Sequence, residues 1–331
     1  MSPTEPQYPS PAEIIPATAM ASSPPAAVLD DLARRAAGYA RQTSSESTRV
    51  AYAKDWKNFE NWCRAMNLDP LPATPATIGV YLTALAGRLA VATLTRRLAA
   101  ISTMHRLSGH ALDTRSSAIH DLMRGVRREH GARQRRVAPA TTALVVAMAG
   151  SCDDTLLGLR DRALLLIGFA SAMRRSELVA LDVADVELVA EGLRITIRRS
   201  KTDQDGAGEV VGIVRTGTPT CPVKALQRWL ETAQIEGGRV FRAVNRHGRI
   251  GEMLTGQSVA LVIKKRAKMI GLVEADFAGH SLRAGLATAA ATNGVDERTI
   301  MRQTRHVGVT VRRYIRDGEM FVGNASGRVG L

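Results

Sequence analysis

Near its C-terminus the chain reads Thr304-Arg305-His306-Val307-Gly308-Val309-Thr310-Val311-Arg312-Arg313-Tyr314-Ile315-Arg316. Tyr314 is the only tyrosine beyond Tyr81. Two other basic motifs precede it, Arg174-Arg175-Ser176-Glu177-Leu178 and His280-Ser281-Leu282-Arg283. Arginine grips two phosphate oxygens at once and keeps its charge, and a tyrosine hydroxyl can serve as a nucleophile. The ordered set therefore indicates chemistry on a phosphodiester.

Length and charge narrow the class of protein. A chain of 331 residues is longer than a single hydrophobic core usually grows, so we expect two domains, and a hydrophobic fraction of 45% is enough to fill both. The formal net charge of +14 favours a polyanionic partner, because each Lys or Arg placed on a phosphate releases counterions. Charge alone also fits other basic proteins, so the motifs must decide.

The three cysteines are Cys63, Cys152 and Cys221. Their odd number and wide spacing predict neither a disulfide framework nor a zinc site, which fits a reducing cytoplasm. The sequence contains no run of about 18 apolar residues and no pattern of a signal peptide, so we expect a soluble protein that makes no contact with a membrane.

The first half of the chain has a helical pattern. Residues 1–27 hold seven of the thirteen prolines, which disfavour helix, so we predict a disordered tail there. In residues 28–130, apolar residues recur at helical spacing and predict a bundle of four or five helices. The expected helix starts are Ser47-Thr48, Thr74-Pro75, Thr93 and Ser116. One apolar stripe, interpreted as core, comprises Tyr52, Trp56, Phe59, Trp62 and Cys63.

The second half, residues 139–331, mixes helices and strands. Residues 156–170 predict an apolar helix, and residues 192–199 alternate like a strand that returns as residues 210–214 through a glycine-containing turn. Residues 258–270 predict an amphipathic helix that ends at Gly271, with Lys264, Lys265, Arg266 and Lys268 facing mostly outward. The fold class is therefore mainly α with a small β-sheet (α+β).

The order Arg, Lys, His-x-x-Arg, His, Tyr resembles the tyrosine recombinase (phage integrase) family over roughly residues 30 to 320. The resemblance implies a helical-bundle core-binding domain, residues 28–130. Within it, the segment Leu89–Gly109 is the part most similar to the family's core-binding domain. It also implies a basic linker, residues 131–138. A mixed catalytic domain of the DNA breaking and rejoining type, residues 139–331, would follow the linker. The protein would be a bacterial, phage-like or plasmid-like enzyme that works on the nucleoid.

The resemblance also assigns roles to residues. Arg174, by the phase of its motif rather than Arg175, and Arg283 would clamp the scissile phosphate, with Glu177 orienting the arginines. His280 would exchange the proton of the nucleophile Tyr314, and His306 would donate a hydrogen bond to the phosphate. Lys201, which heads the hairpin turn, would protonate the departing 5′ oxygen. A solvated hairpin lysine is the alternative, because Arg198 and Arg199 are also near.

The expected partner is double-stranded DNA carrying inverted-repeat sites, on two of which the protein would act as a homotetramer through a 3′-phosphotyrosine and a Holliday junction. The expected phosphate contacts are Arg96, Arg97, Arg124, Arg127, Arg128, Arg133, Arg135, Arg136, Lys264 and Lys265. For such basic runs a solvated face is the bland alternative. By the same resemblance, the end of the chain from Glu319 would dock on a neighbouring subunit.

Neither a cofactor nor a metal is expected, because Asp153-Asp154 and Asp203-Gln204-Asp205 fall in predicted loops and form no convincing magnesium cluster. Two features depart from the family pattern. Thr304-Arg305-His306 stands where Leu-Gly-His is common, and His306 precedes Tyr314 by eight residues instead of nine. A type IB topoisomerase-like enzyme and a DNA-binding regulator with impaired catalysis remain as alternatives.

Overall fold

The computed structural model of the chain describes residues 28, 30–32, 34–35, 45–131, 137–198, 208–306, 311–312 and 314–315. The chain divides into two compact units, residues 1–134 and 135–331, and each has its own hydrophobic core. The predicted tail, residues 1–27, and residues 132–136 of the predicted linker lie outside the described residues.

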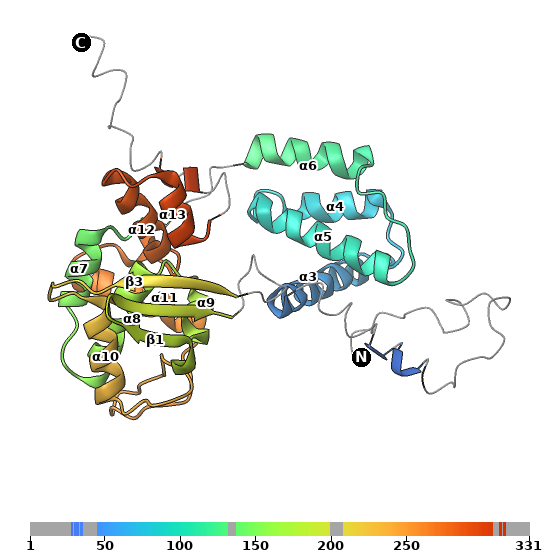
Figure 1. The fold of residues 1–331 in the computed structure, drawn as a ribbon. Helices are drawn as coiled ribbons and strands as arrows, with labels where there is room; N and C mark the ends of the chain where they lie inside the picture. The colour runs from blue at the N-terminus through green and yellow to red at the C-terminus, as the bar shows by residue number, and fades with distance from the viewer. Residues whose placement is uncertain are drawn as a thin grey trace, which may run out of the picture. The chain divides into compact units, whose positions relative to one another are not determined.

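The described part of the first unit comprises the helices α3 (Glu46–Ala65), α4 (Pro75–Leu85), α5 (Val91–Leu107) and α6 (Ser117–His130) (Figure 1). The side chain of Thr74 accepts a hydrogen bond from the Thr77 N–H, and Pro75 occupies the first turn, as is typical of a helix N-terminus. The starts predicted at Thr74-Pro75 and Ser116 are confirmed. Helix α5 begins two residues before Thr93, because Val91 already packs against the core.

Aromatic side chains fill the core of this unit. Phe59 and Tyr81 are fully buried, with ring centroids 4.9 Å apart. Trp56 and Trp62 are partly buried and flank Phe59 at 5.6 and 6.4 Å. The interpretation of the stripe as core is confirmed for Trp56, Phe59, Trp62 and Cys63, whereas Tyr52 is half-buried and lies outside this cluster. The buried His105 also serves the fold, since its Nε2 accepts from the Ala73 N–H and its Nδ1 lies 2.9 Å from the carbonyl of Ile101.

The second unit combines seven α-helices with one sheet in its described part. Its helices are α7 (Thr142–Gly150), α8 (Leu156–Ala170), α9 (Arg175–Ala180), α10 (Pro222–Thr232), α11 (Gly256–Met269), α12 (Ser281–Thr292) and α13 (Glu297–Thr304). Two short 3-10 turns, η1 (Val183–Asp185) and η2 (Glu274–Asp276), lie between them. The antiparallel sheet has the order β1 (Val186–Val189), β2 (Gly192–Ile197), β3 (Glu209–Val214). The bounds predicted for α8 are confirmed, whereas β1 escaped prediction because its four residues include the exposed Glu187 and Leu188.

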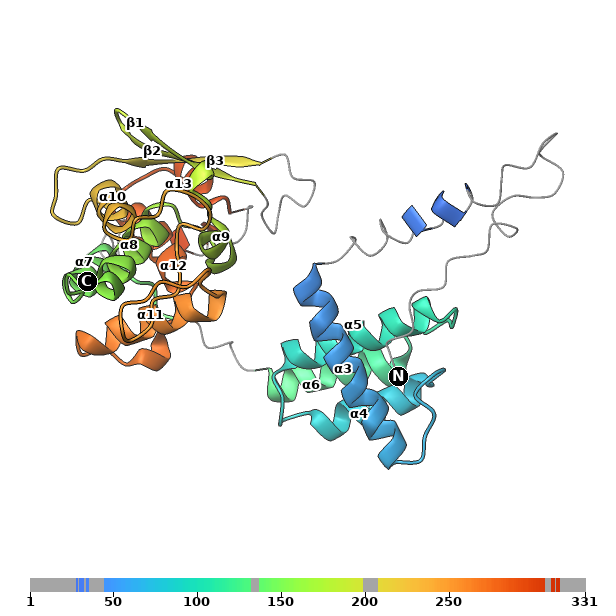
Figure 2. The ribbon, with the colours of Figure 1, turned by 90° about the horizontal axis from the view of Figure 1, so that it is seen from below.

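Helix α8 lies at the centre of this unit, where ten of its fifteen residues are buried. The sheet lies along one side of the unit, with α8 and α10 beneath it (Figure 2). Helix α12 packs closely against the segment that precedes α7. A Cβ at Gly285 would lie 1.9 Å from the carbonyl oxygen of Ala140, so only glycine permits this approach. The contact fixes α12, which carries Arg283, against the body of the unit.

The prediction that Arg266 faces outward is wrong. Its side chain is buried, and Nε and Nη2 donate to Oδ2 of the buried Asp161 at 3.0 and 2.7 Å. Arg160 donates to the other oxygen of the same carboxylate. Helical periodicity alone could not reveal this, because a buried charge depends on a partner that is distant in sequence. No helix in the described ranges is long and apolar enough to cross a membrane.

Candidate active site

The segment between α8 and α9 positions Arg174. The side chain of Glu177, one turn into α9, accepts from the backbone N–H of Arg174 at 2.9 Å and from its Nη1 at 2.6 Å. Glu177 is buried, while the side chain of Arg174 is 21% exposed and therefore reachable by a ligand. Arg175 is exposed, and its side chain lies against Gly279 rather than against Glu177. Arg174, and not Arg175, is therefore the arginine that Glu177 holds.

Helix α12 positions Arg283, which is 1% exposed. Its Nη1 donates to the carbonyl of Ala172 at 2.5 Å, its Nη2 to the carbonyl of Arg305 at 3.2 Å and its Nε to Nε2 of His306 at 3.1 Å. Burial, together with repulsion by Arg174 and Arg305, lowers the pKa of Arg283 to about 10. The guanidinium therefore keeps its charge at neutral pH, and contacts within the protein hold all three of its nitrogens in place.

The hydrogen bonds around His306 define its tautomer. The hydroxyl of Thr304 donates to the carbonyl of Ile300 at 2.7 Å, so it accepts the proton on Nδ1 of His306 at 3.0 Å. The other ring nitrogen, Nε2, accepts from Arg283. Burial, followed by repulsion from Arg283, lowers the pKa of His306 to about 3, so the ring is neutral. The predicted donation from His306 to a phosphate stays a prediction, because here Nε2 is an acceptor.

Tyr314 lies within the same cluster. Its hydroxyl is 2.7 Å from Nε2 of His280, and its ring centroid is 5.3 Å from that of His306. The tyrosine is half-buried and packs beside Ala287, Ile300 and the rest of a small apolar cluster. The eight-residue spacing therefore still brings this tyrosine to the histidines of its own chain. Residues 307–310 lie outside the described ranges.

His280 occupies the N-cap position of α12, where its side chain makes no capping hydrogen bond, and it is exposed at the surface. Displacement of water by the surrounding protein, together with repulsion from Arg283 and Arg174, lowers its pKa below the ordinary value of 6.5. A neutral imidazole with its proton on Nδ1 accepts a proton at Nε2. The short contact to Tyr314 therefore has the geometry of a general base beside its substrate hydroxyl.

Lys201 lies outside the described residues, although the base of its hairpin is described and ends at the pair Ile197↔Glu209. Arg133, Arg135 and Arg136 also lie outside them. In the described part of the chain, no group of three His, Cys, Asp or Glu side chains is arranged to hold a metal ion.

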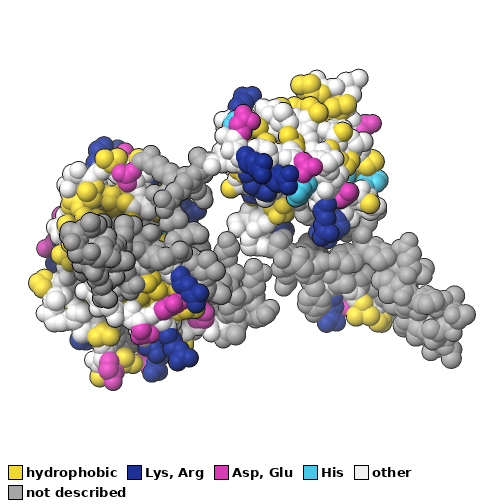
Figure 3. Space-filling view, turned by 90° about the horizontal axis from the view of Figure 1, so that it is seen from above, with side chains coloured by type: hydrophobic (Ala, Val, Ile, Leu, Met, Phe, Trp, Pro, Cys, Tyr) yellow, Lys and Arg dark blue, Asp and Glu magenta, His cyan; other side chains and the backbone are white. Residues whose placement is uncertain are grey.

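The other residues expected to contact DNA differ in how exposed their side chains are. The side chain of Arg97 is only 14% exposed, because it donates to Asn58 and to the hydroxyl of Tyr81. Arg96 pairs with the buried Asp55 at 2.7 Å but is 49% exposed. Arg124, Arg127 and Arg128 are exposed on α6. Figure 3 shows a face of the protein on which basic and acidic side chains both occur among hydrophobic ones. On α11, Lys265 is exposed and Lys264 half-buried. Arg97 is thus the contact that burial disfavours.

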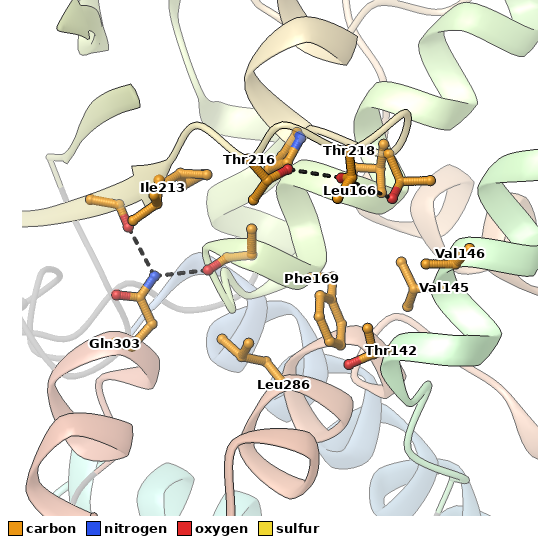
Figure 4. Close-up of a pocket in the computed structure, with 15 residues that line it drawn as sticks. Thr142, Val145, Val146, Leu166, Phe169, Ile213, Thr216, Thr218, Leu286 and Gln303 are labelled. Carbon is orange, nitrogen blue, oxygen red and sulfur yellow. Dashed lines mark hydrogen bonds between the residues drawn. The ribbon is translucent and has the colours of Figure 1, made fainter. Parts of the chain in front are cut away.

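A separate hollow of about 590 Å³ lies between β3 and the helices α7, α8 and α12 (Figure 4). Apolar side chains such as Phe169 and Leu286 line it. Gln303 closes one end by donating to the carbonyls of Ala170 and Gly212 at 2.8 and 3.0 Å. Among the described residues, no predicted catalytic side chain lines this hollow, so its size does not mark the site of the chemistry.

Sequence reasoning missed one member of the cluster, Arg305. The sequence marks it only as a departure from the family pattern, yet its guanidinium is buried and binds Glu177 at 2.9 Å. The available signal was a large basic side chain at a position where the family commonly has glycine.

The chain has a helical unit and a mixed unit, and the mixed unit brings arginines, histidines and a tyrosine together. This combination is typical of the class of proteins that break and rejoin DNA. Residues 141–319 match the model of the Phage integrase family. An integrase/recombinase described as a XerD homolog, from Selenomonas ruminantium, is 40% identical over 295 residues, which cover 87% of this chain and 86% of the relative. The recombinase cre of Escherichia phage P1 is 26% identical over 84% of this chain and 86% of its own.

Solved structures agree on the fold. A lambda integrase dimer bound to a core site has a TM-score of 0.59 at 16% identity, covering 86% of this chain and 94% of that one. The XerH recombinase bound to a palindromic difH substrate has a TM-score of 0.58 at 18% identity, covering 77% and 72%. The chain belongs to the phage integrase family, whose members are the tyrosine recombinases.

Proposed function

We propose that this protein is a site-specific DNA recombinase in which Tyr314 attacks the scissile phosphodiester. The hydroxyl oxygen of Tyr314 forms a bond to phosphorus, the bond to the 5′ oxygen breaks, and a 3′-phosphotyrosine remains. His280 takes the proton of the hydroxyl, and Lys201 supplies a proton to the departing oxygen. The observation that carries the proposal is the 2.7 Å contact between Tyr314 and His280 inside a cluster of arginines.

The arginines explain how such a reaction proceeds on side chains alone. Charge develops on the non-bridging oxygens as the tyrosine attacks, and the fixed guanidinium groups of Arg174 and Arg283 stabilise it. The phosphotyrosine ester conserves the energy of the broken bond, so a 5′ hydroxyl of another strand can reverse the step. Rejoining therefore requires neither ATP nor a metal.

The relatives support the wider arrangement. XerH is bound to a palindromic substrate, and lambda integrase forms a tetramer on a Holliday junction. We propose by analogy that this chain forms a tetramer on two inverted-repeat DNA sites, in the cytoplasm of a bacterium. The two-unit division at residues 134 and 135 supports separate core-binding and catalytic domains. The end of the chain from Glu319, expected to dock on a neighbour, lies outside the described residues.

The test is the variant Tyr314→Phe, which removes one oxygen. On a nicked DNA site that traps the cleaved state, the natural protein should form a covalent protein–DNA adduct, and the variant should form none while it binds DNA equally well. An adduct in Tyr314→Phe would refute the nucleophile assignment. Absence of any adduct with the natural protein would favour the impaired regulator, and relaxation of supercoiled DNA without exchange between sites would favour the topoisomerase.

A further inference from the structure

Arg305 has a backbone conformation that is unusual for its residue type. With φ 53° and ψ 38°, it ends α13 in the left-handed region, where glycine is the ordinary choice. A side chain is disfavoured in this region, because its Cβ comes too close to the following carbonyl oxygen. Arginine at this position therefore needs a compensating role for its side chain.

The contacts of that side chain show where it acts. The guanidinium is 4% exposed, and Nη2 donates to Oε2 of Glu177 at 2.9 Å. The same nitrogen lies 3.5 Å from the carbonyl of Ala172, and Nε lies 3.5 Å from Oε2 of Glu209, the first residue of β3. Arg305 thus bridges two carboxylates from different parts of the unit.

Glu177 is the link to the phosphate clamp. Its Oε1 accepts from Arg174, and its Oε2 accepts from the backbone N–H of Arg174 and from Arg305. Without Arg305, this buried carboxylate would keep one guanidinium partner among the described residues, and its full charge would act on Arg174. Among the described residues, the cluster contains three guanidinium groups, those of Arg174, Arg283 and Arg305, against the carboxylates of Glu177 and Glu209. Removing Arg305 would cancel the excess of positive charge.

We propose that Arg305 is a positioning residue for the reaction proposed above. By sharing Glu177, it fixes the carboxylate that orients Arg174 and leaves the charge of Arg174 available to the scissile phosphate. The proposal rests on the proposed function. The backbone carbonyl of Arg305 holds Arg283 as well, at 3.2 Å, but any residue at this position supplies that carbonyl. The specific contribution of arginine is its charge next to Glu177.

This role predicts a defect that depends on the charge of the substrate. An uncompensated Glu177 would repel the phosphate and its transition state, which carries added negative charge. A methylphosphonate linkage at the cleavage position replaces one charged oxygen by a methyl group, so its cleavage depends less on positive charge in the site. Loss of folding would instead slow both substrates equally.

The experiment compares Arg305→Gly and Arg305→Met with the natural protein in single-turnover cleavage of both substrates. Glycine suits the left-handed backbone, so Arg305→Gly removes the side chain while favouring the turn. We expect cleavage of the phosphodiester to fall on the order of 10²-fold, as for a catalytic group displaced by about 1 Å. On the methylphosphonate, the loss should be less than about one tenth of that. Arg305→Lys, which retains a charge, should fall between Arg305→Met and the natural protein.

The matched control is Arg194→Met on β2, an exposed arginine paired with Glu187 at 3.1 Å, which should cleave both substrates like the natural protein. Equal losses on the two substrates, or no loss at all, would overturn the role of Arg305. So would unfolding of both Arg305→Gly and Arg305→Met at the assay temperature, because the residue would then be structural. If the natural protein cleaves neither of the two substrates, the proposed function is refuted instead.

Discussion

The neutral His306 should make the catalytic unit sensitive to acid. Its pKa is about 3 in the folded protein, against an ordinary value of 6.5, because burial and the guanidinium of Arg283 disfavour the charged ring. Below pH 6.5 the unfolded chain binds a proton at this histidine and the folded chain does not. Stability is therefore present above pH 6.5 and is lost progressively as the pH falls towards 3.

The size of this loss of stability follows from the pH interval over which only the unfolded chain binds the proton. From pH 6.5 down to pH 5, each pH unit costs about 1.36 kcal/mol for one histidine, which gives about 2 kcal/mol. Urea unfolding at pH 7.5 and pH 5 should show that the free energy of unfolding falls by about this much more in the natural protein than in His306→Gln. Glutamine can still accept from Arg283, and every other titrating group, including His280, is common to both proteins.

The difference between the two pH dependences is therefore the contribution of His306. Parallel curves would refute the reasoning, since they would mean that His306 takes up a proton in the folded protein at its ordinary pKa. The tautomer that the hydrogen bonds to Thr304 and Arg283 define would then be wrong.

DNA binding should weaken steeply with salt, and each of Arg124→Ala, Arg127→Ala and Arg128→Ala should reduce the slope of log affinity against log salt by about 0.9; unchanged slopes would mean that α6 does not contact phosphate. Lys201→Ala should cleave ordinary DNA on the order of 10² to 10⁴ times more slowly. A substrate with sulfur at the 5′ bridging position should restore its cleavage, because a thiolate departs without a proton, and an unrescued variant would exclude acid catalysis by Lys201. Asp161→Asn should destabilise the fold by about 3 to 5 kcal/mol in urea unfolding, because it leaves Arg160 and Arg266 buried with no counter-charge. The exposed Asp154→Asn serves as its control, and equal melting of the two variants would contradict the importance of the buried pair.

Local chemistry explains which parts of the fold the sequence predicts. Continuous apolar character defines α8 from Leu156 to Ala170, and a threonine followed by proline marks the start of α4. Each of these signals is contained in the sequence of its own helix. The burial of Arg266 could not be predicted, because it depends on Asp161, which lies 105 residues away in the chain.

The candidate site divides in the same way. The spacing of His280 and Arg283 and the phase of the Arg174 motif predict the members that the structure brings together. The tautomer of His306 depends on Arg283, 23 residues away in the chain, and Glu177 is shared with Arg305, 128 residues away, so no local pattern encodes either contact. Arg305 shows that a departure from a family pattern can mark a buried side chain that binds another residue of the site.

The contact between Tyr314 and His280 joins two side chains of a single polypeptide. In the proposed reaction the nucleophile and its proton acceptor therefore belong to the same copy of the chain, and each copy in an assembly would cut with its own tyrosine. In a mixture with Tyr314→Phe, the number of strands cut would follow the number of natural copies. A copy without Tyr314 could not be complemented by one without His280, because neither would hold the complete pair.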